Sequence, residues 1–126
     1  MRLRALQHVS TPIPNGRQAA VRQFYSRVLG LREVPVPSTL EGQGLVWFSA
    51  GRQLELHFFP GEPEHGSGRH FCLDVEDLEE ARQALRDAGR DPYDSTPIPN
   101  RPRFFCRDPF GNLIEFTSIQ GDYLTG

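Results

Sequence analysis

The first half of the chain alternates short apolar runs with one segment of helical periodicity. A helix is predicted over residues 17–29, because its apolar residues recur every three or four positions and share one face. We expect Asn15 to cap the start of this helix and Gly30 to end it in a left-handed conformation. The segment 11–16 is predicted to break the chain before the helix. Strands are predicted over residues 3–10, 31–36, 44–49 and 53–59.

The second half repeats this order after a connector rich in glycine and proline, residues 59–68. Its helix is predicted to open at Asp77, which has capping-box spacing to Glu80, and to end at Gly89. A proline-rich stretch over residues 91–102 follows. Strands are predicted over residues 69–75, 103–107 and 112–118, the last two flanking the turn Asp108-Pro109-Phe110-Gly111. The pattern predicts an α+β fold in which a β-α-β-β-β series occurs twice.

The composition fits one domain over residues 1–126, made of modules at about 1–60 and 69–126. Hydrophobic residues make up 37% and charged residues 24%, a balance typical of chains that fold. The net charge is −2 and the basic residues form no cluster, so nucleic acid is not an expected partner. All 14 basic residues are arginines, and the absence of lysine excludes a Schiff-base or phosphate-loop lysine.

No apolar stretch is long enough for a signal peptide or a membrane span, so we expect a cytoplasmic protein without a membrane partner. The two cysteines, Cys72 and Cys106, stand in apolar strands without Cys-x-x-Cys spacing. We therefore predict that both are buried free thiols.

Four ionisable residues interrupt the predicted strands, where an unpaired imidazole or carboxylate is costly. His8 and His70 lie in the first strand of each module, and Glu55 and Glu115 lie at nearly the same separation after them, in the last strand. Pairing of the modules about a pseudo-twofold axis would bring the four side chains together. Two imidazoles and two carboxylates suit one divalent ion, Zn²⁺, Ni²⁺, Co²⁺, Mn²⁺ or Fe²⁺, and do not select among them.

His57 is an alternative to Glu55 as the second ligand, because a strand points these two residues to the same face, about 7 Å apart. If Glu55 binds the metal, His57 would line the substrate pocket as a hydrogen-bond donor or proton shuttle. Trp47, Arg103 and Phe104 are further pocket candidates by strand position. Core packing or a surface ion pair is the simpler interpretation of these three.

Two segments resemble a known family: Phe24-Tyr25-Ser26-Arg27-Val28-Leu29-Gly30-Leu31 and Asp108-Pro109-Phe110-Gly111-Asn112-Leu113-Ile114-Glu115-Phe116. They are similar to the "FYxxVLGL" and "DPxGxxxEF" patterns of the vicinal-oxygen-chelate superfamily. This superfamily includes glyoxalase I, methylmalonyl-CoA epimerase, fosfomycin-resistance thiol transferases, extradiol dioxygenases and bleomycin-binding proteins. The resemblance covers essentially the whole chain. It implies two modules that form a glyoxalase-type open β-barrel cleft, and a homodimer, since modules of this superfamily often pair across chains.

By this resemblance, His8, Glu55, His70 and Glu115 match the metal ligands of glyoxalase I. The implied activity is that of a metal-dependent lyase or isomerase acting on a small-molecule substrate. The metal would polarise a carbonyl, and Glu55 or Glu115 would remove the neighbouring proton.

Other members of the superfamily supply alternatives. One is a metal-free, antibiotic-type binding protein. Another is a thiol transferase of the fosfomycin-resistance kind, whose metal ligands resemble His8, His70 and Glu115 alone. Ser10 stands where one of these families places a threonine, two residues beyond the first ligand. A ring-cleaving dioxygenase is disfavoured, because Glu55 would occupy a position that substrate or oxygen needs.

Overall fold

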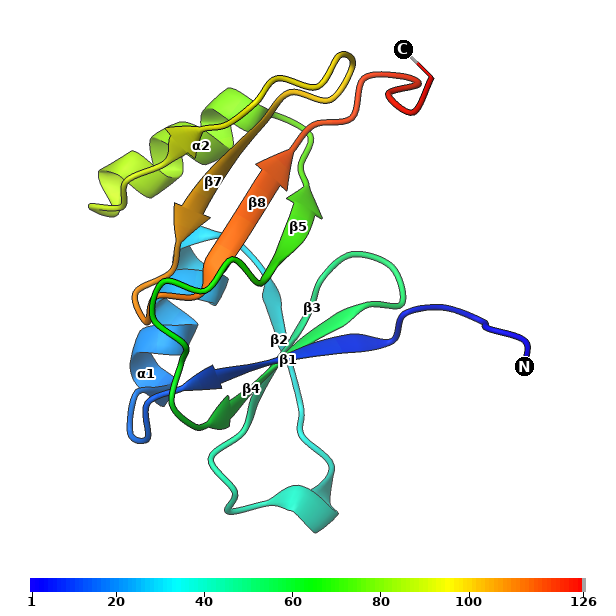
Figure 1. Cartoon of the computed structure of the whole chain (residues 1–126). Helices are drawn as coiled ribbons and strands as arrows, with labels where there is room; N and C mark the ends of the chain where they lie inside the picture. The colour runs from blue at the N-terminus through cyan, green and yellow to red at the C-terminus, as the bar shows by residue number, and fades with distance from the viewer. Residues whose placement is uncertain (126) are drawn as a thin grey trace. The chain divides into compact units, whose positions relative to one another are not determined.

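A computed structural model of the chain describes residues 1–125, which form two compact units that meet in sequence between Pro63 and Glu64 (Figure 1). This boundary lies within the predicted connector, residues 59–68. Each unit contains one 4-stranded sheet, and the βαβββ series occurs in both units, as predicted. Among the described residues, no helix is long and apolar enough to cross a membrane.

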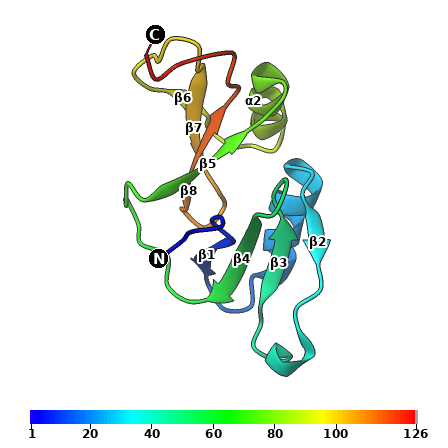
Figure 2. The same ribbon diagram turned by 90° about the vertical axis from the view of Figure 1, so that its right-hand side faces the viewer.

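The first unit runs from strand β1 (His8–Ile13) through a helix to three further strands. The helix begins as α1 (Gln18–Val21) and continues as a π-helix, η1 (Arg22–Val28). The later elements are β2 (Arg32–Val34), the 3₁₀ turn η2 (Ser38–Leu40), β3 (Val46–Ser49) and β4 (Glu55–Pro60). The sheet order is β1-β4-β3-β2, with β1 parallel to β4 and the other pairs antiparallel (Figure 2). Strand β4 therefore lies between β1 and β3.

The two faces of this sheet differ because side chains alternate along each strand. One face packs against the helix, where the ring of Tyr25 contacts those of Phe48 and Phe58. The fully buried side chains of this core include Ile13, Val21, Tyr25, Val46, Phe48 and Phe58. The opposite face carries His8, Ser10, Trp47, Glu55 and His57 at paired strand positions. The helix therefore leaves the candidate site residues on the other side of the sheet.

The second unit runs from β5 (His70–Asp74) through helix α2 (Leu78–Asp87) to β6 (Tyr93–Asp94), β7 (Arg103–Arg107) and β8 (Leu113–Thr117). Its sheet order is β5-β8-β7-β6, with β5 parallel to β8. Helix α2 begins as predicted, since the side chain of Asp77 accepts the backbone N–H of Glu80 at 3.1 Å. Gly89 follows its last turn with a φ of +78°, which is also as predicted.

The core face of the second sheet contains Phe104, Ile114 and Phe116, and the guanidinium carbon of Arg82 in α2 lies 4.6 Å from the ring centre of Phe104. The opposite face carries His70, Cys72, Arg103, Phe105 and Glu115, which follow from the register of β5, β8 and β7. As in the first unit, the candidate site residues lie on the face away from the helix.

Asp108 fixes the turn between β7 and β8. Its Oδ1 accepts the backbone N–H groups of Phe110 and Asn112 at 2.9 and 2.8 Å, and its Oδ2 accepts the side-chain amide of Asn112 at 3.0 Å. Gly111 has a φ of +92°, a conformation that glycine adopts without steric cost. The predicted turn is confirmed, and it sets the register of the strand that carries Glu115.

Three local predictions were wrong. Strand β1 starts at His8, not at Leu3, and extends to Ile13, into the segment that was predicted to break the chain. Pro12 is tolerated there because β1 is an edge strand of its sheet, where a missing N–H costs no ladder bond. The helix cap position is Arg17, not Asn15, and it makes no side-chain cap bond. Strand β6 lies in the stretch predicted to be a loop, and it supplies the third strand after α2 that the sequence pattern lacked.

Candidate functional site

His57 lies at the middle of the site face of the first unit, with an aromatic ring on each side. The ring centre of Trp47 in β3 is 3.7 Å away with planes 1° apart, and that of His8 in β1 is 4.1 Å away with planes 15° apart. The register produces this stack, because Trp47 is directly opposite His57 and His8 is one diagonal position away. Only 8% of His57 is exposed, so its ring is held in place.

His8, Glu55 and His57 are called the first histidine cluster. Glu55 belongs to it through a contact with the His57 ring. Its Oε1 accepts a hydrogen bond from Nε2 of His57 at 2.9 Å and one from the amide of Gln7 at 3.4 Å. The bond from His57 holds the pKa of the Glu55 carboxyl below its usual range, although burial opposes this. Glu55 is therefore a charged carboxylate near neutral pH.

His70 and Glu115 form the second histidine cluster. Nδ1 of His70 lies 3.0 Å from the backbone oxygen of Gly68, and Nε2 lies 3.1 Å from Oε1 of Glu115. A neutral imidazole has one N–H, and the Gly68 carbonyl can only accept it. When Nδ1 carries that N–H, the lone pair of Nε2 faces the Glu115 carboxylate, an arrangement that a shared cation would stabilise; in the other tautomer Nε2–H donates to Glu115. A histidine whose other nitrogen donates to a carbonyl is also the usual arrangement of a metal-binding histidine.

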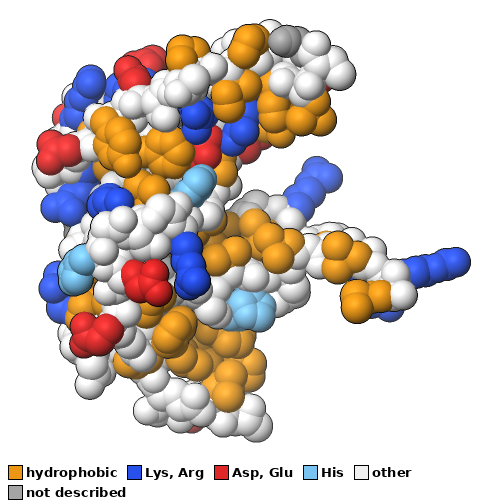
Figure 3. Space-filling model, in the orientation of Figure 1, with side chains coloured by type: hydrophobic (Ala, Val, Ile, Leu, Met, Phe, Trp, Pro, Cys, Tyr) orange, Lys and Arg blue, Asp and Glu red, His pale blue; other side chains and the backbone are white. Residues whose placement is uncertain are grey.

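The second oxygen of Glu115 is held by two arginines that flank it (Figure 3 shows basic and acidic side chains in contact over this sheet). Oε2 accepts from Nη2 of Arg101 at 2.6 Å and from Nη1 of Arg103 at 3.4 Å. Glu115 is 4% exposed, so these are largely buried ion pairs. Its two oxygens are thus divided between His70 on one side and the arginines on the other.

The two clusters are not matched in the way the sequence suggested. In the first sheet, His8 is directly opposite Glu55, and His57 is one diagonal step from His8. In the second sheet, His70 is directly opposite Leu113, and Glu115 is one diagonal step from His70. By register, the equivalent of Glu115 is therefore His57, and the equivalent of Glu55 is Leu113. The pairing with the neighbouring strand agrees, since Trp47 opposes His57 as Phe105 opposes Glu115.

Most of the pocket candidates lie on the expected faces. Ser10 and Trp47 are on the site face of the first unit, and Arg103 is on that of the second. Phe104 is not: it is fully buried in the core and stacks on Phe116. Its neighbour Phe105 has the site-face position that was assigned to Phe104, and its ring meets that of His70 edge to face at 5.1 Å.

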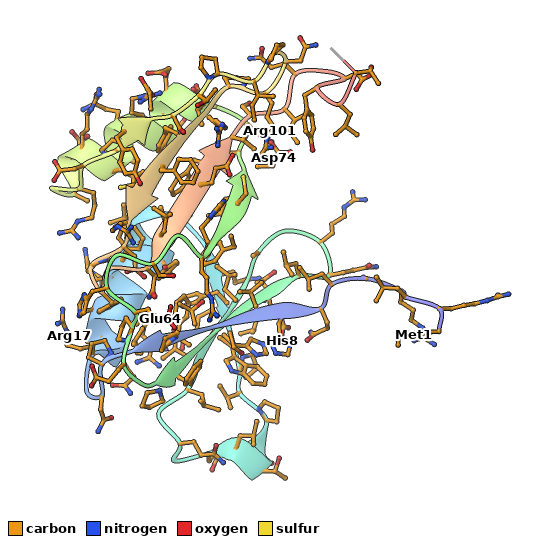
Figure 4. The ribbon with its side chains drawn as sticks, in the orientation of Figure 1. Met1, His8, Arg17, Glu64, Asp74 and Arg101 are labelled. Atoms are coloured by element: carbon orange, nitrogen blue, oxygen red, sulfur yellow. The ribbon has the colours of Figure 1, made fainter. Side chains whose placement is uncertain are left out.

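Sequence reasoning missed Arg101 as a site residue. Arg101 stands two residues before the first residue of β7, outside the predicted strand, so strand alternation did not select it. Figure 4 labels Arg101 and, at the end of β5, Asp74. The carboxylate of Asp74 accepts the backbone N–H of Ile119 at 3.2 Å.

Both cysteines are free thiols, as predicted, but only Cys106 is buried. Cys72 is exposed, because the register places it on the site face directly opposite Glu115. Partial desolvation of its thiol group still raises the pKa of Cys72, so this thiol is not an activated nucleophile. Within residues 1–125, no group of three or more His, Cys, Asp or Glu side chains is arranged so that it could hold a metal ion.

A model of the Glyoxalase/Bleomycin resistance protein/Dioxygenase superfamily matches residues 5–116. The chain therefore belongs to this superfamily. A solved structure of a putative glyoxalase family protein from Bacillus anthracis is 31% identical, with a TM-score of 0.85, over 94% of this chain and 98% of that one. No curated protein matches the chain.

Two more distant structures share the fold but carry different functions. A lactoylglutathione lyase from Agrobacterium tumefaciens is 24% identical with a TM-score of 0.70, over 94% of this chain and 96% of that one. TnmS3, an antibiotic binding protein from Streptomyces sp. CB03234, is 19% identical with a TM-score of 0.71, over 94% and 98%. The superfamily thus includes both enzymes and binding proteins, and its fold alone does not assign an activity.

Proposed function

We propose that the protein is a divalent-metal-dependent lyase or isomerase, which removes the proton next to a carbonyl of a small substrate. The observation that carries this proposal is the contact between Nε2 of His70 and Oε1 of Glu115, with Nδ1 of His70 held by Gly68. Such an orientation prepares an imidazole and a carboxylate to share one cation.

We propose His8, His57, His70 and Glu115 as the ligands, with His57 in place of Glu55. The register supports this choice, because His57 has the position in its sheet that Glu115 has in the other. The bond from Nε2 of His57 to Glu55 leaves Nδ1 for a metal, and a carboxylate partner of this kind orients metal-bound histidines. Three imidazoles and one carboxylate suit late first-row ions such as Zn²⁺, Ni²⁺ or Co²⁺.

The stack of His8 on His57 sets a condition on this ligand set. The lone pair of an imidazole nitrogen lies in the ring plane, so two rings stacked at 4.1 Å cannot direct lone pairs at one ion. One ring must turn on binding. His57 is buried beside Trp47, whereas His8 is exposed, so His8 is the residue that turns.

Glu55 is the better candidate for the catalytic base. Protonation of Oε2 of Glu115 would disrupt its contacts with Arg101 and Arg103, whereas Glu55 is partly exposed and bears a charge near neutral pH. A bound divalent ion supplies Lewis-acid polarisation of the substrate carbonyl, which makes the neighbouring proton removable. In this proposal Glu55 takes that proton, and His57 keeps the Glu55 carboxylate oriented.

A metal-free binding protein is the second candidate. The stack of Trp47, His57 and His8 presents flat rings on the site face, a surface suited to an aromatic ligand. The fold likeness to an antibiotic binding protein is compatible with this reading.

Metal analysis followed by a substrate panel tests the proposal. The protein is incubated with Zn²⁺, Ni²⁺, Co²⁺ or Mn²⁺, dialysed, and analysed for bound metal. One ion per chain is expected, and no uptake of any of the four would overturn the metalloenzyme proposal. Loaded protein is then assayed with the methylglyoxal–glutathione adduct, methylmalonyl-CoA, and fosfomycin with thiols. Turnover of either of the first two supports a lyase or isomerase, whereas turnover of fosfomycin alone would replace it by a thiol transferase.

A further inference from the structure

The two arginines beside Glu115 carry more positive charge than one carboxylate neutralises. Arg101 and Arg103 both contact the same oxygen, Oε2, and both side chains are at least four-fifths buried, with 19% and 15% exposed. One carboxylate therefore faces two guanidinium groups. The carboxylate of Asp74, at the end of β5, is exposed and accepts the backbone N–H of Ile119.

The hydrogen bonds of Arg101 are also incomplete. Its Nη2 donates to Glu115, and a long contact of 3.6 Å joins the same nitrogen to the sulfur of Cys72. Its Nε is buried and has no hydrogen-bond partner among the described residues. A guanidinium pairs best with an oxyanion through two parallel N–H groups, and Glu115 uses one of those on Arg101. A buried donor without an acceptor costs free energy, so such donors are rare in folded proteins. A bound ligand that accepts from Nε would remove this cost.

Two other arginines of the same unit, Arg107 and Arg82, have acceptors for their guanidinium groups. Arg107 lies on the same strand and face as Arg103, but its guanidinium donates to the backbone oxygens of Gly111 and Ser67 at 2.8 and 3.3 Å. Arg82 is paired with Asp94 at 2.9 Å. Arg103 donates twice to the backbone oxygen of Thr96, which fixes its guanidinium beside Glu115. Nε of Arg101 differs from these groups in being buried without an acceptor among the described residues.

We propose that Arg101 and Arg103 form a subsite for a carboxylate that is separate from the metal-binding oxygens of the substrate, so that the substrate of the proposed enzyme is an organic acid with such a second anionic group. This carboxylate binds the two guanidiniums on the Oε2 side of Glu115, while the other oxygens of the substrate face the metal ligands. This inference rests on the proposed function for its metal, but the arginine pair itself is observed without any metal. Two fixed guanidiniums would orient the substrate and reject neutral analogues, because a neutral group leaves the buried charges unpaired.

Two small acids that differ by one carboxylate test this subsite. Lactate and malate both offer a hydroxyl next to a carboxylate, and malate adds a second carboxylate. Calorimetric titration of metal-loaded wild-type protein, freed of excess metal, is expected to show malate binding at least about tenfold more tightly, since a charge-assisted hydrogen bond is worth about that factor. Arg101→Gln and Arg103→Gln should each lose this preference, because malate binding weakens toward the affinity for lactate.

The control is Arg86→Gln, which removes the same charge from an exposed position in the last turn of α2. It should keep the full preference for malate. Elemental analysis of each variant checks that metal content is unchanged, because Glu115 also contacts the two arginines. Equal binding of lactate and malate by loaded wild-type protein would overturn the inference and leave the arginines as partners of Glu115.

Failure of the proposed function has a different signature. If the wild-type protein takes up no metal, the same titrations are run on metal-free protein with malate. If the metal-free wild-type protein binds malate and Arg101→Gln does not, the carboxylate subsite is supported although the metalloenzyme proposal has failed. Absence of malate binding in that case overturns the subsite as well.

Discussion

His57 and Glu115 have equivalent positions in the two sheets, each on the last strand of its unit and one diagonal step from the histidine that begins the first strand. Their surroundings differ. The ring of His57 is stacked between Trp47 and His8, whereas Glu115 is held by His70 and two arginines. A duplicated framework thus carries an imidazole in one unit and a carboxylate in the other. Glu55, one pleat away from His57, is left free for a different role.

The first prediction follows from this equivalence. His57→Ala should abolish stoichiometric binding of Ni²⁺, because it removes a ligand. Glu55→Gln should keep one ion per chain with about tenfold lower affinity, the expected effect of losing the partner of a metal-bound histidine. Calorimetric titration of both variants with Ni²⁺ measures this difference, and circular dichroism checks that each is folded.

Trp47→Phe is the matched control for this comparison. It removes the indole that stacks on His57 but keeps an aromatic ring beside it. The affinity for Ni²⁺ should therefore change by less than it does in His57→Ala or Glu55→Gln. The opposite outcome, in which Glu55→Gln loses the metal and His57→Ala keeps it, would make Glu55 the ligand. The close parallel with the glyoxalase I ligand set would then be restored.

A second prediction contrasts two neighbours on β7. Phe104→Ala should lower the free energy of unfolding by about 3–5 kcal/mol, since it opens a cavity in the core of the second unit. Phe105→Ala should cost less than about 2 kcal/mol, because its ring is only partly buried. Urea denaturation gives both values. A larger loss for Phe105 than for Phe104 would reverse the assignment of faces.

The element order was predictable because apolar periodicity and turn residues are local signals. The boundaries of β7, the cap at Asp77 and the turn at Asp108 follow from spacing within a few residues. Strand β1 was placed too early because Pro12 was taken as a breaker, and only the sheet order shows that it lies on an edge. Strand β6, with Tyr93 and Asp94, is too short for periodicity to reveal.

The strand faces on which most of the candidate residues lie were predictable, but the register between the strands was not. Strand alternation identifies which side chains share a face, so His8, His57, His70 and Glu115 could be selected from the sequence. Pairing between strands depends on contacts far apart in the chain. Spacing alone therefore matched Glu115 with Glu55, whereas the register matches it with His57. The same limit hid Arg101, whose significance depends on its contact with Glu115.

A third prediction concerns the turn that positions Glu115. Asp108→Ala should destabilise the protein by about 2–4 kcal/mol, because it leaves the backbone N–H groups of Phe110 and Asn112 without their carboxylate acceptor in a buried turn. The exposed Asp87, which accepts one hydrogen bond from Gln83, provides the control, and Asp87→Ala should change stability by less than about 0.5 kcal/mol. Thermal unfolding followed by circular dichroism measures both, and equal losses would contradict the role given to Asp108.

The fourth prediction is that the protein is a homodimer. Each sheet is covered by its own helix on one face, and the other face carries aromatic and ionisable side chains that include Trp47 and Phe105. Sedimentation equilibrium at micromolar concentration should give twice the chain mass of 14.3 kDa. A species at the chain mass under these conditions would contradict the prediction.

The last prediction is that metal binding is recovered when two damaged chains are mixed. His8→Ala disables the first histidine cluster and leaves His70 with Glu115, whereas His70→Ala disables the second and leaves His8 with His57. Each variant alone should fail to hold one ion per chain. If a metal site takes one cluster from each chain of the dimer, a mixed dimer has one intact site and one doubly damaged site. Mixing the two variants under conditions that exchange subunits should therefore restore part of the Ni²⁺ uptake, measured by elemental analysis after dialysis. The double variant His8→Ala/His70→Ala mixed with wild type provides the control, because its mixed dimers contain no intact site of this kind. If exchange is verified by mass and no uptake returns, both clusters of a site belong to one chain.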